Sequence, residues 1–230
     1  MNSTTPKRRF MRYNLRAMLV VLTAFGVWLG VQVNRVKRQK EVVQWVEENG
    51  GKATYNWQFD ENDRYSDKTK PPGPAWLQRQ IGDEYFQSVV AVTLHQTEVH
   101  DPSPLARLTK LKWLHLSGNP VGDISALASL THLKRIGLSN TRVIDLSPLA
   151  NLTNLETLYL VGTQVNDISP LAKLPHLKTL DLAGSQVSDL SQLANVSSLE
   201  ALHISNTPVT AEAIAELQKA LPSCKIYQYH

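Results

Sequence analysis

The sequence contains a single cysteine, Cys224, among its 230 residues. One thiol cannot form an intrachain disulfide or a cysteine-based metal cluster, so the cysteine content leaves the redox compartment open. The sequence also lacks a GxxxxGK[ST] phosphate-binding loop, a GxSxG nucleophile motif and an HExxH zinc motif. Because neither a nucleophile nor a phosphate cradle can be proposed, we expect no enzymatic activity, no catalytic residue and no cofactor.

Acidic side chains are absent from positions 1–40, which hold nine lysines or arginines. Positions 41–230 carry fifteen basic and twenty acidic side chains, a net charge of −5, although the whole chain has a net charge of +4. The basic character is therefore a local property of the N-terminal segment. A local basic segment is no signature of nucleic-acid binding, and we expect none.

Residues 17–33, AMLVVLTAFGVWLGVQV, contain no charged side chain. A helix of this length spans about 26 Å at ~1.5 Å per residue, enough for a hydrocarbon core of roughly 30 Å when flanking basic side chains reach the interface. We therefore expect a transmembrane helix that contacts the lipid membrane, after a basic tail over residues 1–16. A cleaved secretory signal is the alternative, although no small-x-small cleavage site follows the apolar core.

The orientation of this single span follows from the basic residues close to it. Five precede the span and four follow it, so the N-terminal side has a narrow excess. We predict a cytoplasmic N-terminus and an exported repeat domain.

Residues 34–87 are predicted to form a juxtamembrane helix and an N-terminal cap. Valines and a tryptophan share one side of a helix over residues 34–49, and Gly50 and Gly51 follow as a stop signal. Partial alternation over residues 52–59 predicts a strand, and residues 75–82 predict a short helix. Aromatic side chains of this region are expected to cover the first hydrophobic layer of the following domain: Tyr55, Trp57, Phe59, Trp76, Tyr85 and Phe86.

From Lys110 onward the sequence repeats with a constant 22-residue period. Three consecutive copies read HLKRIGLSNTRVIDLSPLANLT, NLETLYLVGTQVNDISPLAKLP and HLKTLDLAGSQVSDLSQLANVS. A degenerate copy begins at Ser88, and two further copies begin at Lys110 and Ser198. Because a lone repeat cannot bury its hydrophobic faces, we expect residues 88–209 to form a stacked solenoid.

Each part of the repeat predicts one element of a coil. Alternating leucines point inward from a short strand, neighbouring strands pair into a parallel sheet, and a polar turn with a buried valine follows. The Asp-Ile/Leu-Ser segment, often followed by proline, predicts serine as the N-cap of a short helical turn. The aspartates recur in step with the repeat, so we interpret them as backbone caps rather than cation ligands: Asp123, Asp145, Asp167 and Asp189.

These copies resemble the leucine-rich-repeat superfamily, in particular the 22-residue repeats of internalin-like and phosphatase-regulator-like proteins. The resemblance implies an α/β leucine-rich-repeat solenoid with a parallel sheet on the concave face and short helical or 3-10 turns on the convex face. The segments FMRYNLRAMLVVL, GGKATYNW and PPGPAWL resemble membrane-anchored leucine-rich-repeat proteins of planctomycete-type bacteria. This second likeness implies an N-terminal anchor.

The last repeat departs from the pattern, and residues 210–230 resemble a C-terminal cap. Thr210 is placed to cap a longer helix that ends near Leu221, and a final strand is expected from Lys225 to Tyr229. Cys224 lies between them, and we interpret it as a buried structural thiol.

The outward-facing strand residues of the expected sheet form three columns on the concave face. Exposed aromatic side chains and arginine carry most of the binding free energy at interfaces, which makes this face the candidate protein-binding surface. The candidate contacts are Trp113, His115, Arg135, Tyr159, Asp181 and His203. The two histidines share a column four repeats apart, about 19 Å at ~4.8 Å per strand, so we predict no metal site from them.

Two functions follow as hypotheses. The first is a membrane-anchored protein that binds an unidentified protein, rather than a small molecule, through the concave face. The second is a structural or scaffolding spacer whose contacts are made by the anchor and the juxtamembrane region. The first hypothesis predicts that concave-face substitutions abolish partner capture, whereas the second predicts loss only on deletion of residues 34–88.

Overall fold

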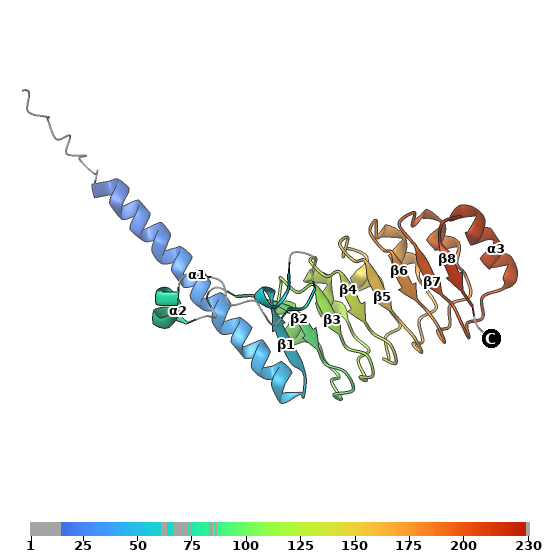
Figure 1. The fold of residues 1–230 in the computed structure, drawn as a ribbon, viewed down its shortest axis with the longest axis horizontal. Helices are drawn as coiled ribbons and strands as arrows, with labels where there is room; N and C mark the ends of the chain where they lie inside the picture. The colour runs from blue at the N-terminus through green and yellow to red at the C-terminus, as the bar shows by residue number, and fades with distance from the viewer. Residues whose placement is uncertain are drawn as a thin grey trace, which may run out of the picture.

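The computed structural model describes residues 15–60, 64–66, 73, 75–82, 85 and 87–228. Figure 1 shows a stack of coils with a long helix at one end and a short helix at the other. One eight-stranded sheet runs through the stack in sequence order. Its strands are β1 (Lys52–Tyr55), β2 (Val89–Thr93), β3 (Trp113–His115), β4 (Arg135–Gly137), β5 (Thr157–Tyr159), β6 (Thr179–Asp181), β7 (Ala201–His203) and β8 (Lys225–Tyr227).

Helix α1 (Leu15–Glu48) is continuous, so the predicted span and the predicted juxtamembrane helix form one element. Its apolar N-terminal half makes no buried contact with the rest of the described chain, and its most apolar window has a mean hydropathy of 1.7. This length and composition suit a membrane anchor or a signal sequence. Most of the predicted basic tail lies outside the described residues.

The C-terminal half of α1 covers the first coil of the stack. Val36, Val42 and Val46 are buried, and Val43 and Trp45 lie beside them as predicted. The helix ends where two backbone bonds close a Schellman motif, from the Gly50 amide to the Glu47 carbonyl (2.9 Å) and from the Gly51 amide to the Val46 carbonyl (2.8 Å). The predicted Gly-Gly stop is therefore confirmed.

The strand predicted over residues 52–59 is too long. Strand β1 ends at Tyr55, and residues 56–58 form the 3-10 turn η1 (Asn56–Gln58). The Gln58 side chain accepts a hydrogen bond from the Tyr55 amide (2.9 Å), and the Asn56 side chain accepts one from the Ser88 amide (2.9 Å). These side chains accept from backbone amides next to the last strand pair, Tyr55 and Val89, and only the bond from the Asn56 amide to the Ser88 carbonyl (2.9 Å) extends the pairing beyond it.

The predicted aromatic cover is only partly correct. Tyr55 packs against the core, and the Trp57 indole N–H donates to the Gln87 side chain at 2.8 Å. Helix α2 (Ala75–Ile81) forms as predicted, but its Trp76 is 61% exposed and covers no part of the core. Phe86 lies outside the described residues.

The repeats stack in uniform register. Strands β2 to β8 are parallel, and each residue pairs with the residue 22 positions further along the chain up to β7. The inward column is fully or almost fully buried, as are the valines of the following turns. Its members are Leu114, Ile136, Leu158, Leu180 and Leu202. The core is therefore a continuous hydrophobic rod shared by neighbouring coils.

The turn after each strand requires a left-handed residue. Positive φ values between 54° and 76° recur at this position of each coil, at Gln96, Gly118, Asn140, Gly162, Gly184 and Asn206, and the first coil has a second one at Glu98. Glycine and asparagine adopt this conformation at low cost, which explains why they occupy every one of these positions except the first. The next side chain satisfies the bend, as where the Thr141 hydroxyl donates to the Leu138 carbonyl at 2.6 Å.

Short 3-10 turns line the convex side of the coils. They are η3 (Ser103–Arg107), η4 (Ser125–Ser129), η5 (Ser147–Leu149), η6 (Ser169–Lys173) and η7 (Ser191–Asn195). The predicted serine N-cap is wrong, because serine is the first residue of each turn. The aspartate two positions earlier accepts from the serine amide, at 2.8 Å for Asp145 and Ser147. The prediction that the aspartates cap the backbone is confirmed.

The far end of the stack is closed by α3 (Ala211–Ala220) and β8. The Thr210 hydroxyl accepts from the Ala213 amide at 3.2 Å, which confirms the predicted N-cap. Leu217 and Leu221 are buried against the last coil, and Cys224 is buried as expected. Burial raises the pKa of the Cys224 thiol, so the group stays protonated and unreactive.

Candidate functional site on the concave face

Strand register brings the predicted contact residues into columns. Trp113 pairs with Arg135 in one column, and His115, Gly137 and Tyr159 follow one another in the next. Asp181 and His203 continue the second column towards the C-terminal end of the sheet. The structure therefore confirms that these residues form columns on one face of the sheet. Their role in binding stays a prediction.

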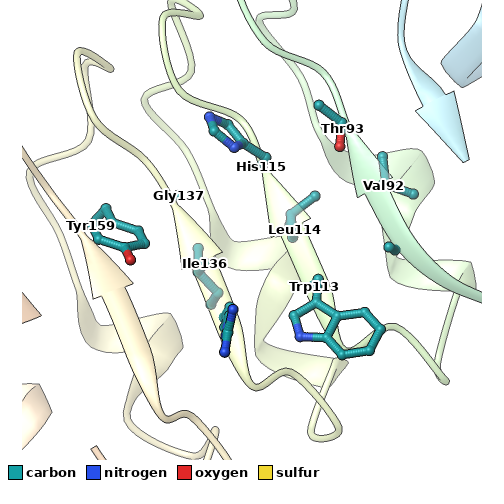
Figure 2. A pocket seen from close by; sticks show the side chains of 10 residues that line it. Val92, Thr93, Trp113, Leu114, His115, Ile136, Gly137 and Tyr159 are labelled. Carbon is teal, nitrogen blue, oxygen red and sulfur yellow. The ribbon is translucent and has the colours of Figure 1, made fainter. Parts of the chain in front are cut away.

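The N-terminal part of this face contains a hollow of about 280 Å³. Figure 2 shows Gly137 between His115 and Tyr159. Trp113 lies on the same strand as His115, two positions before it. Gly137 has no side chain, and a β-carbon placed there would lie 3.1 Å from the Ser117 hydroxyl and 3.5 Å from the His115 ring. The absence of a side chain at this one position of the column opens the hollow.

Arg135 is the only fixed charge among the ten residues that line the hollow. Its side chain is exposed, and no carboxylate of the described chain pairs with it. Tyr159, on the next strand, is 42% exposed. An unpaired guanidinium beside an exposed aromatic ring is a combination that carries binding energy at interfaces.

Trp113 is half-buried because the N-terminal cap covers it. The Phe59 ring lies 4.3 Å from the Trp113 ring, centroid to centroid, and the Lys112 ammonium lies 5.5 Å from the indole centroid. Trp113 therefore fastens the cap to the sheet as well as lining the hollow. Phe59 is among the aromatic residues predicted to cover the first layer, but the sequence does not indicate that its ring packs on Trp113.

His115 stands at the rim of the hollow beside His95. The two rings meet edge to face at 5.1 Å, and His95 Nδ1 lies 2.9 Å from the Ser117 carbonyl oxygen. Partial burial lowers the pKa of His115 below the ordinary imidazole value, and the positive form of His95 lowers it further. His115 is therefore neutral at pH 7. Among the described residues, no three side chains that could ligate a metal ion lie together.

The C-terminal half of the face offers less to a partner. The Asp181 carboxylate accepts from the Ala183 amide at 3.1 Å, and the His203 ring stacks on Tyr227 at 4.5 Å. Both side chains are half-buried and already have intramolecular contacts. Of the six predicted residues, His115, Arg135 and Tyr159 are the exposed ones.

The fold and this face define a class, the parallel-sheet solenoids built from 22-residue coils. A family profile described as Leucine Rich repeats (2 copies) matches residues 109–151 and 153–195. The chain belongs to the leucine-rich-repeat family. Members of this family typically act as non-enzymatic scaffolds for protein–protein interaction.

Three solved bacterial structures are similar to this chain. An internalin (inlF) of Listeria monocytogenes is 32% identical with a TM-score of 0.53 over 58% of this chain and 41% of its own. Internalin C2 of the same organism is 31% identical with a TM-score of 0.55 over 64% and 74%. A leucine-rich-repeat protein of Leptospira interrogans is 26% identical with a TM-score of 0.53 over 56% and 34%. No curated protein matched the sequence.

Proposed function

We propose that this protein is a membrane-anchored binding module that captures another protein through the hollow on its concave face. The observation that carries the proposal is the arrangement around Gly137. An open floor lies between His115 and Tyr159, and the unpaired Arg135 stands beside it. Residues 17–33 of α1 supply the anchor, with the N-terminus in the cytoplasm and the repeats exported.

The lining restricts the chemistry of the partner. It is mostly apolar and aromatic, and its histidine is neutral at pH 7, so Arg135 alone supplies charge. A partner segment that inserts an apolar side chain over Gly137 and places a carboxylate against Arg135 satisfies both features. The proposed contacts are therefore Arg135, Tyr159 and His115 first, with Trp113, Asp181 and His203 at the edges.

The test is capture by the full-length protein in native membranes, with Arg135→Ala and Tyr159→Ala combined. Proximity labelling identifies the partner, and binding is then measured directly. A matched control combines Arg142→Ala and Ile144→Ala, which remove an exposed arginine and an exposed hydrophobic side chain outside the sheet. We expect the partner to be lost only from the concave double variant. Equal capture by both variants would contradict the proposal.

Trp113 is left unchanged in this test because it also holds the cap through Phe59. Loss of capture in a Trp113 variant would therefore mix two causes.

The docking of α1 supports a second candidate function, a rigid spacer. The Glu41 carboxylate pairs with Arg107 at 3.0 Å, and α1 runs unbroken from the apolar segment into this contact. A spacer predicts that both double variants keep every partner. It also predicts that partners are lost when the exposed Lys37 and Arg38 of α1 are changed to glutamate.

A further inference from the structure

Trp76 on α2 has no structural role in the solenoid. Outside α1 it is the most exposed large hydrophobic side chain of the described residues. Its neighbour on the same helix, Arg79, is exposed and bonds only to the carbonyl of Ala75 among the described contacts, at 3.2 Å. An exposed tryptophan next to a cation is the pattern of a side-chain pair that lies at a membrane–water interface.

Hydrogen bonds place the segment after α2 against α1 just beyond the apolar stretch. The Arg35 guanidinium donates to the Tyr85 carbonyl at 3.3 Å, and the Gln39 side chain donates to the Gln87 carbonyl at 3.5 Å. Arg35 is two positions past the end of the uncharged segment 17–33.

The chain between α2 and this contact is short. Helix α2 ends at Ile81, four positions before Tyr85, and a chain of that length spans at most about 14 Å. Figure 1 shows α2 beside the middle of α1, away from the sheet. Helix α2, which carries Trp76, therefore lies near the height at which the apolar segment of α1 gives way to charged residues.

The exposed charged side chains that the structure describes on α2 and on the adjoining part of α1 are basic, although Asp83 and Glu84 follow α2 in the sequence. Lys37 and Arg38 on α1 and Arg79 on α2 are exposed, positions 1–40 include no acid, and α2 has none. Anionic headgroups attract cations within a Debye length of the surface, and indole rings favour the headgroup layer. An anionic bilayer surface matches both the ring and the charges.

We propose that α2 is a second membrane contact, with Trp76 seated in the headgroup layer of an anionic bilayer and Arg79 against the lipid phosphates. The proposal rests on the membrane anchoring by residues 17–33 proposed above. Because α1 is continuous and docked on the first coil, this second contact restricts the tilt of α1 and of the attached repeats against the bilayer. It therefore sets the direction in which the concave hollow faces relative to the membrane.

The test measures lipid contact at single labelled positions of the full-length protein in vesicles of phosphatidylcholine and phosphatidylglycerol. A fluorescent thiol label is attached at Ala75→Cys on α2, at Val27→Cys in the span, or at Gln164→Cys on an exposed distant turn. Headgroup-quencher lipid reports contact at position 75, and acyl-chain quencher reports insertion at position 27. The unsubstituted chain gives the background of the buried Cys224.

We expect quenching at positions 27 and 75 and none at position 164. Trp76→Ser in the Ala75→Cys background should lose most of the quenching at position 75, as should Arg79→Glu, while position 27 is unchanged. Quenching at position 27 alone would leave the anchor intact and overturn the second contact. Absence of quenching at both positions would overturn the anchor and the second contact together.

Discussion

The two halves of the concave face share one backbone and one core but differ at their surface. Strands β2 to β5 present the hollow, the unpaired Arg135 and the exposed Tyr159. Strands β6 and β7 present small residues such as Thr179 and Ala201, and their Asp181 and His203 side chains have contacts within the chain. The repeat consensus specifies the buried positions, so the two halves of the face can differ only at the outward positions that the consensus leaves open.

The largest effect is expected in the core, where the two halves should behave alike. Ile136→Ala and Leu180→Ala remove fully buried side chains from β4 and β6. Each should lower the free energy of unfolding by about 2–5 kcal/mol, because a cavity adds to the lost burial. Urea unfolding measures this, with Thr179→Ala as a surface control. A loss confined to one half would show that the stack is not one core.

Filling the hollow should separate the two halves. Gly137→Val places a side chain against His115 and Ser117, and the position has no positive φ that would strain it. We expect partner affinity to fall at least about tenfold, ~1.4 kcal/mol, while Ala201→Val in the C-terminal half leaves it unchanged. Direct binding to the identified partner is the measurement. Equal affinities for the two variants would remove the distinction between the halves.

Each end of the face is fastened by an aromatic contact, and the two should be of similar strength. Phe59 packs on Trp113 at 4.3 Å, and Tyr227 packs on His203 at 4.5 Å. Double-mutant cycles to alanine should give a coupling of about 0.5–1.5 kcal/mol for each pair. A coupling near zero for Phe59 and Trp113 would mean that the cap is held by other contacts.

The smallest effect is expected at the aspartate caps, and it should be equal in both halves. Hydrogen bonds from Ser147 and Ser191 lower the pKa of Asp145 and Asp189 below the ordinary 3.8. A lowered carboxyl pKa stabilises the folded state above pH 3.8, and this contribution is lost as the pH falls through the folded pKa.

Asp145→Ala and Asp189→Ala should therefore each lower Tm slightly at pH 7. Their Tm differences from the unsubstituted chain should shrink as the pH falls below 3.8. Thermal unfolding at a series of pH values measures this, with Asp→Asn variants as controls that keep an acceptor. A difference that persists in acid would assign the effect to packing.

Much of the fold could be predicted because every repeat has the same pattern of hydrophobic and turn residues. The parallel strands, the valine column, the Thr210 cap and the end of α1 at two glycines all follow from local patterns. The serine cap is wrong because the aspartate two positions earlier accepts from the amide of the serine itself, which places the serine inside the turn rather than before it. The predicted strand after Gly51 is too long because its end depends on where β2 begins, at Val89.

The candidate site was less predictable. The columns place the predicted residues on the concave face, but a column does not reveal which of its members already have contacts within the chain. Asp181 and His203 have such contacts, and Trp113 is covered by Phe59 from a segment far earlier in the sequence. The hollow lies where Gly137 contributes no side chain to the column. The sequence shows the glycine, but only the structure shows which side chains surround it.

The sequence alone determined the 22-residue coil, the order of its strands and the faces that are buried, because each repeat imposes the same hydrophobic period on its neighbours. Only the tertiary structure decided which residues of α1 are buried against the first coil, that Trp76 is left exposed, and that the hollow lies in one half of the face. These features depend on contacts between segments that share no repeat, and no local pattern encodes such contacts.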